Sequence, residues 1–437
     1  MIKPYRLRRL WAPTAGFSKA IGAFVLGVIA FLFGLGLSFR TLIYPVLKFL
    51  NDLTSGTVGQ YVRPASVDTA KWAIGGLLLL LGFFLMARAV RLAFRQVFDT
   101  VNPGTQSGRL DRYVRRQQLS QGPRIVALGG GTGLSTLLRG LKHHTSNITA
   151  IVTVTDDGGS SGMLRKDKGM IPPGDIRNCM VALADAETSM TGLFQHRFKN
   201  DSGSLSGHSM GNLLIAAMVD QAKGDFEKAI EIASDVLAIR GRVVPSTLSH
   251  VGLRAELDDG REICGETAIV QAGGKIKKLH LLPEDCEPTK EALDAIRTAD
   301  LVVIGPGSVF TSIIPNLLVK GIVKALEETR SKRVYICNVM TQPGESDSFS
   351  ASQHVTAIMA NVDGRPFDYV LVNTAMPTEE ALQKYREYDQ HFVDPDIDRV
   401  RALGFRAIQG NLMSETDVVR HDPMRLAARL IGLIEMK

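Results

Sequence analysis

Cysteine is scarce in this 437-residue chain, and the spacing of the few cysteines argues against a disulfide framework and against a structural zinc site. The four cysteines lie far apart and form no Cys-x-x-Cys pair; they are Cys179, Cys264, Cys286 and Cys337. Disulfide-built secreted domains and structural zinc sites both need closely spaced cysteines. We therefore expect reduced thiols in a cytosolic domain that is held together by apolar side chains.

The motifs of several large enzyme classes are also missing. There is no Gly-x-Ser-x-Gly elbow, and no cysteine stands beside a histidine, so the sequence points to no nucleophile. The most glycine-rich stretch, Gly129–Gly133, is not followed by Lys-Ser or Lys-Thr, which excludes a P-loop. Its nearest match to a dinucleotide fingerprint is Gly131-x-Gly133-x-x-Thr136, with threonine where a third glycine or alanine belongs.

A basic excess is absent from most of the chain, although the whole chain has a formal net charge of +7. Residues 1–119 carry 16 Lys+Arg against 4 Asp+Glu, so the remaining residues are mildly acidic. A domain that binds nucleic acid needs a basic surface. We therefore expect no nucleic-acid partner, and we assign the basic charge to the N-terminal region.

Two apolar runs without charge stand out in that N-terminal region. Residues 20–39 have no charged side chain, and residues 72–87 form a second run that extends to residue 90 if Arg88 lies at the membrane surface. A helix of roughly 20 apolar residues crosses a hydrocarbon core. The pair predicts a transmembrane hairpin with spans near 20–39 and 72–90. A cleaved signal peptide is the alternative for the first run, but the run lacks a small-residue cleavage site.

Basic residues on both outer sides of the hairpin predict its orientation. Lysines and arginines precede the first run, arginines follow the second, and the loop between the runs is nearly neutral. By the positive-inside rule, both termini lie in the cytoplasm. We predict three parts: a multi-pass hairpin over 1–98 in the inner (cytoplasmic) membrane, a polar linker over 99–122, and a cytoplasmic domain over 123–437.

Beyond the linker, short apolar strands alternate with amphipathic helices. This alternation predicts an α/β fold with a mostly parallel sheet and helices on both faces. Ligands bind such sheets beyond the carboxyl ends of the strands, so polar residues there are the site candidates. We expect strands at 125–128, 148–154, 276–282, 301–304, 334–339, 369–372 and 407–411, and helices at 175–185, 211–220, 226–239, 313–326, 355–360, 378–388 and 423–436.

The glycine-rich stretch is the first site candidate. An apolar strand, Ile125–Leu128, runs into four glycines in five positions, and leucines at helical spacing follow from Leu134. Glycines let the backbone approach a ligand, and the free N–H groups of a helix N-terminus bind phosphate. We predict an anionic ligand, such as a nucleotide, at Gly130, Gly131, Thr132 and Gly133. A glycine corner without a ligand is the alternative.

The second strand ends in Thr-Asp-Asp-Gly-Gly-Ser-Ser-Gly. Its two carboxylates, Asp156 and Asp157, are candidates to hold Mg²⁺ or to accept sugar hydroxyls. The backbone that follows is a candidate oxyanion site, formed by Gly158, Gly159, Ser160 and Ser161. A solvated turn is the alternative for this segment.

Polar residues recur at the other helix starts and strand ends. The predicted ligand contacts there are Arg177, Asn178, His208, Asn212, Gly305, Gly307, Ser308, Ser312, Asn338 and Gln342. Asp175 is expected to act as an N-cap, and Asp422 is expected to cap the last helix. Just before that helix, Arg420 is a candidate to bind a diphosphate, and Tyr385 to stack on a base or sugar. In the alternative, Arg420 pairs with a surface carboxylate and Tyr385 lies in the core.

Six motifs in a fixed order carry a family resemblance: GGGTG, TDDGGSSG, PPGDIRN, GHSMGN, GPGSVFTSIIPNL and NVMTQPGE. Over residues 120–437 they resemble the gluconeogenesis-factor (YvcK-like) proteins, which are relatives of the 2-phospho-lactate transferases (CofD-like) of deazaflavin biosynthesis. The resemblance implies a modified Rossmann-like fold with its site at these loops. It also implies binding of a nucleotide sugar of the UDP-N-acetylglucosamine (UDP-GlcNAc) kind, and a role in gluconeogenic growth, central carbon metabolism and cell shape.

Two functions stay open at this stage. The glycine turns and hydroxyl-rich loops favour a protein that binds its ligand without chemistry. With the role that the resemblance implies, this is a regulatory protein that senses a nucleotide sugar and acts on envelope-synthesis enzymes, and we expect a homo-oligomer. The alternative is a transferase that uses Asp156, Asp157 and Mg²⁺, as in the transferase relatives, although no acid–base pair can be assigned. Two features depart from the typical, soluble family member: the N-terminal hairpin, and Phe310 where related sequences often carry tyrosine.

Overall fold

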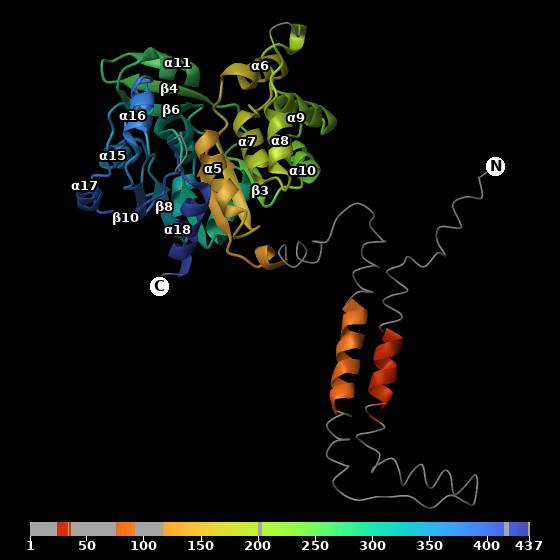
Figure 1. Ribbon diagram of the computed structural model, residues 1–437. Coiled ribbons are helices and arrows are strands. Elements are labelled where there is room, and N and C mark those ends of the chain that lie inside the picture. Colours follow the sequence, from red (N-terminus) through yellow and green to blue (C-terminus); the bar gives the residue numbers. More distant parts are fainter. Residues whose placement is uncertain are drawn as a thin grey trace, which may run out of the picture. The chain divides into compact units, whose positions relative to one another are not determined.

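The computed structural model describes residues 24–33, 35, 76–91, 117–199, 203–414 and 419–435. The chain separates into two units, Met1–Arg112 and Tyr113–Lys437. The second unit is an α/β domain (Figure 1).

Seven parallel strands form the main sheet of this domain, in the order β10-β9-β8-β7-β1-β2-β3. Strands β1, β2 and β7 are buried along their whole length, as expected of a sheet covered on both faces. The strands are β1 Ile125–Gly129, β2 Ile148–Val152, β3 Arg242–Pro245, β7 Leu301–Ile304, β8 Lys332–Ile336, β9 Tyr369–Asn373 and β10 Arg406–Gly410. The α/β class and the parallel sheet are thus confirmed, whereas β3 was not predicted.

The chain moves away from β1 in two directions, and this places helices on both faces of the sheet. Right-handed crossovers that run in opposite directions put their helices on opposite faces. Helix α5 (Gly131–Leu141) contacts both α7 (Gly174–Leu183) and α18 (Pro423–Glu435). The crossovers from β7 to β10 carry α14 (Ile322–Glu328), α15 (Ala351–Asn361) and α17 (Ile397–Ala402), while α12 (Lys290–Thr298) contacts α14. Between β1 and β7 the strand order reverses, which marks the expected ligand position.

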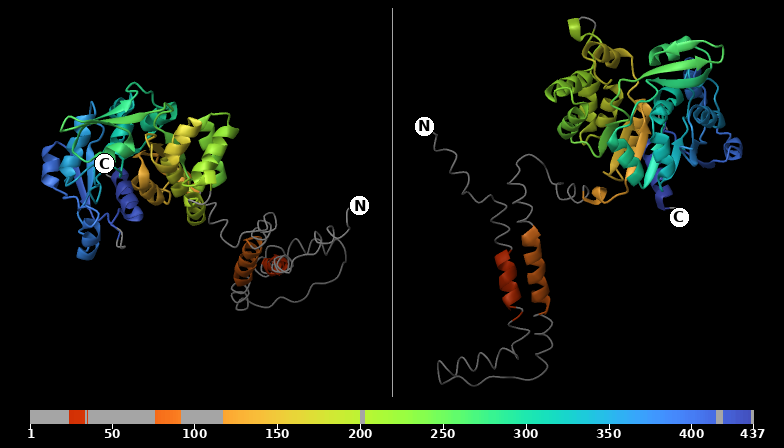
Figure 2. Two further views of the ribbon diagram at one scale, coloured as in Figure 1. Left: turned by 90° about the horizontal axis from the view of Figure 1, so that it is seen from above. Right: turned by 180° about the vertical axis from the view of Figure 1, so that it is seen from behind.

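A small antiparallel sheet lies at the same end of the domain as α6 (Figures 1 and 2). Its strands, in the order β5-β4-β6, are β4 Gly252–Leu257, β5 Glu262–Cys264 and β6 Ile276–Leu282. Helix α11 (Glu266–Ala272) connects β5 to β6. Because α6 (Gly159–Lys168) starts beyond the carboxyl end of β2, this sheet and α11 are close to the edge at which ligands are expected. The remaining helices are α8 Glu187–Gln195, α9 Met210–Gln221, α10 Phe226–Leu237 and α16 Glu379–Arg386.

Several local expectations need correction. The helix expected over 313–326 is not continuous. A π-helical turn, η4 (Val309–Ile313), leads into α13 (Ile314–Leu318), and α14 follows as a separate helix. The break before α14 falls at Gly321, which takes a left-handed conformation with φ +84°. Asp175 does not cap α7; the helix already begins at Gly174, and Asp175 lies inside its first turn. Asp422 does cap α18, since its carboxylate accepts from the N–H groups of Met424 (2.9 Å) and Arg425 (2.8 Å).

In the N-terminal unit, two apolar helices over 24–33 and 76–91 touch through glycines. A Cβ on Gly82 would lie 2.7 Å from the carbonyl oxygen of Gly27, so the two backbones meet there. Large apolar side chains point outward, including Leu80 (72% exposed) and Phe83 (66% exposed). Within the described residues, no single helix has the length and apolar character needed to cross a membrane. The predicted spans 20–39 and 72–90 lie partly outside the described residues.

The contact between α5 and α18 generates a stability prediction. A Cβ on Gly140 of α5 would overlap the carbonyl oxygen of Pro423 at the start of α18. We expect Gly140→Ala to lower the free energy of unfolding by about 1–3 kcal/mol, the usual cost of overpacking. Gly432→Ala in α18 is the matched control, because a Cβ there meets no atom within 4 Å. Denaturant unfolding should show no loss for the control, and equal stability of both variants would contradict the prediction.

Candidate functional site

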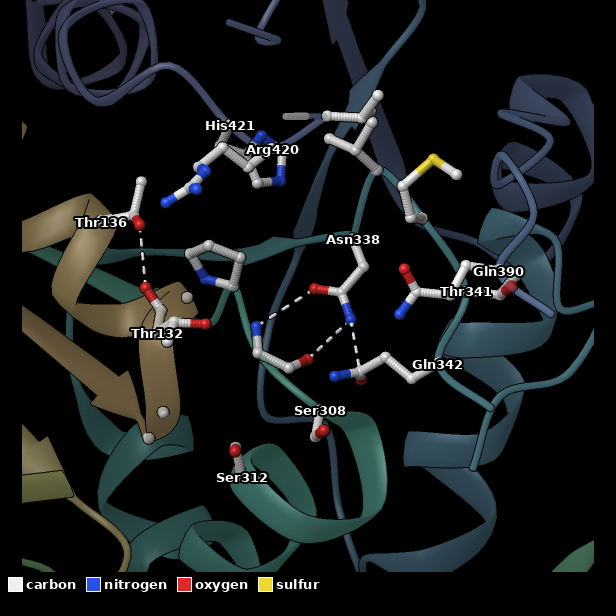
Figure 3. A pocket seen from close by; sticks show the side chains of 18 of the residues that line it. Thr132, Thr136, Ser308, Ser312, Asn338, Thr341, Gln342, Gln390, Arg420 and His421 are labelled. Atoms are coloured by element: carbon white, nitrogen blue, oxygen red, sulfur yellow. Dashed lines mark hydrogen bonds between the residues drawn. The ribbon is translucent and has the colours of Figure 1, made fainter. Parts of the chain in front are cut away.

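A cavity of about 450 Å³ opens where the strand order reverses (Figure 3). It is bordered by the glycine corner between β1 and α5, the loops after β7 and β8, helix α16 and the segment before α18. The sequence-predicted residues that line it are Gly130, Gly131, Thr132, Gly133, Gly307, Ser308, Ser312, Asn338, Gln342, Tyr385 and Arg420. Other lining residues were not predicted: Thr136, Pro306, Val339, Met340, Thr341, Gln390, Val419 and His421.

The glycine corner needs glycine for two separate reasons. Gly131 has φ +61°, in the left-handed region that other residues avoid. A Cβ on Gly133 would overlap the carbonyl oxygen of Pro306 in the loop after β7. The corner leads into α5, which has neither a side-chain cap nor an acidic residue in its first turn. The Asp175 carboxyl accepts from the N–H of Gly131, the first residue of α5. The rest of this first turn places N–H groups and a positive dipole end beside the cavity.

Arg420 and Tyr385 both reach this cavity. Arg420 is exposed, and no described residue forms an ion pair with its guanidinium. It lies on the side of Thr132 and Thr136, whereas Thr341, Gln342 and Gln390 lie opposite (Figure 3). The Tyr385 hydroxyl donates to the carbonyl of Val419 (3.4 Å), so the segment before α18 orients this ring. The alternative in which Arg420 pairs with a surface carboxylate does not hold among the described residues.

Asn338 joins the loops after β7 and β8. Its Oδ1 accepts from the N–H of Gly307 (3.2 Å), and its Nδ2 donates to the Gly307 carbonyl (2.9 Å) and to Gln342 Oε1 (3.4 Å; Figure 3). These bonds fix two loops that are distant in sequence as one wall of the cavity. Phe310 does not line this wall; it is buried, and its ring packs edge-on against Phe349. The phenylalanine at this position therefore does not change the lining of this cavity.

The remaining predicted residues do not line the cavity: Asp156, Asp157, Gly158, Gly159, Ser160, Ser161, Arg177, Asn178, His208, Asn212 and Gly305. Several of them form a buried network around Arg177. Its guanidinium donates to Ser209 Oγ (2.5 Å), Asn212 Oδ1 (2.8 Å) and Asn178 Oδ1 (2.9 Å). Asn212 in turn donates to Ser160 Oγ (3.1 Å). Ser160 lies in the first turn of α6, Arg177 in that of α7 and Asn212 in that of α9. The network therefore joins the N-termini of three helices.

The two adjacent carboxylates after β2 face different neighbours. Asp157 Oδ1 accepts from the N–H (3.0 Å) and hydroxyl (2.6 Å) of Thr267, and it thereby caps α11. Asp156 Oδ1 accepts from the N–H of Gly158 (2.9 Å). Among the described residues, no group of three or more His, Cys, Asp or Glu side chains is arranged to hold a metal ion. The joint magnesium site at Asp156 and Asp157 stays a prediction.

Two carboxyls that the sequence did not single out as ligand contacts surround Asp156. Burial raises the pKa of Asp175 to about 6, although the amide of Gly131 counteracts it. Burial, with a smaller effect of Asp156, raises the pKa of Glu266 to about 9, although Glu266 accepts from the Thr155 hydroxyl (2.9 Å). A Cβ on Gly130 would lie 2.5 Å from Asp175 Oδ2, so this carboxyl touches the glycine corner. The corner therefore separates a polar cavity from a group of carboxyls.

Comparison with known proteins now identifies the family. A family model described as 2-phospho-L-lactate transferase CofD matches residues 125–413. A putative gluconeogenesis factor of Nostoc sp. is 46% identical over 402 residues, which cover 91% of this chain and 86% of that protein. The gluconeogenesis factor of Bacillus subtilis is 47% identical over 318 residues, which cover 72% of this chain and 100% of that protein. This chain belongs to the gluconeogenesis factor family, which is CofD-like.

The solved structures agree with this family assignment. A crystal structure of a UPF0052-family protein from Bacillus halodurans has a TM-score of 0.67 and 46% sequence identity, and it covers 71% of this chain and 99% of that one. All of the Bacillus subtilis gluconeogenesis factor is matched by 72% of this chain, whereas the match to the Nostoc protein covers 91%. Part of the N-terminal region is therefore shared with the Nostoc relative, beyond the domain that the Bacillus proteins match.

The raised pKa of Glu266 predicts how stability changes with pH. Its pKa is about 9 in the folded domain against 4.5 in a free side chain, so its contribution is complete below about 4.5 and is lost as the pH rises to about 9. Glu266→Gln, which cannot ionise, should be more stable than wild type near pH 8 and should lose this difference near pH 5. Thermal melting across this range measures it. Glu262→Gln, at an exposed position, is the control, and a constant difference for Glu266→Gln would contradict the prediction.

Proposed function

We propose that this gluconeogenesis factor binds a nucleotide sugar of the UDP-GlcNAc type in the 450 Å³ cavity. One observation carries the proposal: the N-terminus of α5 borders the same cavity as the guanidinium of Arg420, which pairs with no carboxylate among the described residues. Both groups bind phosphate oxygens, the first through backbone N–H groups and the second through two parallel hydrogen bonds. A diphosphate placed between them would be bound from two sides.

The rest of the cavity supports the same ligand class. Its volume lies within the ordinary range for small-molecule sites, about 300–1,000 Å³. Hydroxyl and amide side chains on the wall opposite Arg420 suit the hydroxyls of ribose and of an amino sugar (Figure 3). Tyr385 supplies an aromatic ring for stacking on the base or a sugar face.

We further propose a regulatory role in carbon metabolism, gluconeogenic growth and cell shape, exerted by a homo-oligomer on envelope-synthesis enzymes. Relatives that match most of this chain are named gluconeogenesis factors, which supports the metabolic part.

Asp175 supports a second candidate, a transferase of phosphoryl-linked groups like the CofD enzymes whose family model matches. Its carboxyl touches the glycine corner, and a pKa raised to about 6 suits an acid or base near neutral pH. In this candidate Asp156 would hold Mg²⁺, because Asp157 Oδ1 already accepts from the N–H and hydroxyl of Thr267 at the start of α11. Mg²⁺, when bound, would offset charge on a phosphate. Mass spectrometry after incubation with Mg²⁺ and nucleotide-activated donors separates this candidate from pure binding.

We also propose that the N-terminal unit attaches the protein to the cytoplasmic membrane as a hairpin, with the α/β domain in the cytoplasm. Helices 24–33 and 76–91 support this proposal, because they meet at small residues and expose large apolar side chains around the pair. Such packing is typical of helices surrounded by lipid. In water, an exposed apolar surface of this kind favours association.

Arg420 provides the first test of this function. Arg420→Ala should weaken binding of UDP-GlcNAc by about 1.5–3 kcal/mol, the range for a hydrogen bond to a charged group, and should leave the melting of the ligand-free protein nearly unchanged. Calorimetric titration measures the affinity. Arg386→Ala is the control, since Arg386 is exposed on α16 and pairs with Glu379 (2.9 Å) away from the cavity lining. Wild-type affinity of Arg420→Ala would remove this residue from the site.

Fractionation tests the membrane proposal. We expect the full chain to sediment with membranes and to need detergent for release, because its apolar helices are exposed. A chain of residues 117–437 should stay in the soluble fraction and should bind the same ligand. If the full chain is recovered from the soluble fraction without detergent, the hairpin does not anchor it.

A further inference from the structure

Glu345 is a buried carboxyl behind the cavity wall that the proposed function does not yet use. It lies in the loop after β8 and is only 8% exposed. Its carboxyl is surrounded by hydrogen-bond donors. Oε1 accepts from the hydroxyls of Ser308 (3.0 Å) and Thr311 (3.1 Å), and the backbone N–H groups of Phe310 and Thr311 also face it.

These donors form the N-terminal end of η4, the turn that carries Ser308 and Ser312 at the cavity. Ser308 is the N-cap residue of η4, yet its side chain caps none of the free N–H groups. Free N–H groups at a helix start need acceptors. Glu345 supplies them from a neighbouring loop, so the protein itself satisfies this helix start.

The contact also decides what Ser308 can offer to a ligand. A serine hydroxyl has one proton to donate and two lone pairs that accept. Because Ser308 donates its only hydroxyl proton to Glu345, the lone pairs of its oxygen are the hydrogen-bonding sites that remain. Ser308 lines the cavity, so this part of the wall accepts hydrogen bonds from a hydroxyl or an N–H group. A phosphate oxygen at neutral pH has no proton to donate there.

The surroundings of Glu345 suit a hydrogen-bond acceptor. Burial raises the pKa of Glu345, while the hydrogen bonds from Ser308, Thr311 and two backbone N–H groups act in the opposite direction. Carboxyl oxygens accept hydrogen bonds, so Glu345 satisfies these donors from behind the cavity wall.

We propose that Glu345 is a positioning residue that sets the orientation of the bound ligand. By holding the proton of Ser308, it makes this wall an acceptor for a hydroxyl or N–H group of the ligand's sugars, while the diphosphate lies at the glycine corner and Arg420. This inference rests on the proposed function, and it adds that the ligand binds in one of its two possible directions along the cavity.

Calorimetric titration of the full-length protein with UDP-GlcNAc tests the inference through a double-mutant cycle. Glu345→Gln and Ser308→Ala should each weaken binding roughly tenfold, the effect expected for one hydrogen bond. The double variant should bind no more weakly than Ser308→Ala, because both changes remove the same interaction. Asp347→Asn is the matched control, because it removes an exposed carboxylate from the same loop. The Asp347 carboxylate accepts from the N–H of Gly344 (3.0 Å). This variant should keep wild-type affinity.

The possible results separate the inference from simpler roles. If the two losses multiply in the double variant, or if Glu345→Gln binds like wild type, Glu345 does not act through Ser308 and the inference is overturned. If wild type itself fails to bind UDP-GlcNAc, the proposed function falls, and the inference falls with it. If Glu345→Gln does not fold, Glu345→Asp replaces it in the cycle, since it keeps the charge and withdraws it from Ser308; the same results are then expected.

Discussion

The close approach of two backbones at the carboxyl edge of the sheet is the constraint on which this domain depends. The start of α5 lies so near the loop after β7 that a side chain at Gly133 would overlap the carbonyl of Pro306. The corner can take this position because Gly131 adopts a left-handed conformation. Since β1 is paired with β7, this contact sets the cavity between the two strands where their crossovers diverge. The other walls of the cavity are built around that fixed point.

Opposite charges are kept apart by the same corner. On its cavity side are the N-terminal turn of α5 and Arg420, while Asp175 contacts the backbone of the corner and lies near Asp156. A phosphate at the corner would thus have cationic and dipolar groups in front of it and carboxyls close behind. Such carboxyls lower the affinity for an anion unless they are protonated or face a cation. Their raised pKa values, about 6 for Asp175 and about 9 for Glu266, show that neutral forms are accessible there.

The sequence could predict the parts of the fold that depend on local pattern. Periodicity placed β1, β2 and β7, and the glycine turn and Asp422 were recognised because each acts within a few residues. It could not show roles that a distant partner decides. Asp157 caps α11 more than a hundred residues later in the chain, and its ligand or metal role stays a prediction. Glu345 went unnoticed because its partners lie on another strand's loop. Arg177, a predicted ligand contact, also joins three helix starts, which no local pattern indicates.

Arg420 depends on its neighbour for its position. His421 is buried, and its Nε2 lies 3.1 Å from the carbonyl oxygen of Cys337, directly after β8. Burial lowers the pKa of His421 to about 4, so the imidazole stays neutral at physiological pH and adds no charge beside the guanidinium. Because the Cys337 carbonyl oxygen can only accept, Nε2 of His421 carries the proton in this hydrogen bond. The bond therefore fixes both the tautomer and the orientation of the ring. This uncharged contact fixes the backbone from which the exposed Arg420 side chain reaches the cavity, and it places no second cation beside the guanidinium.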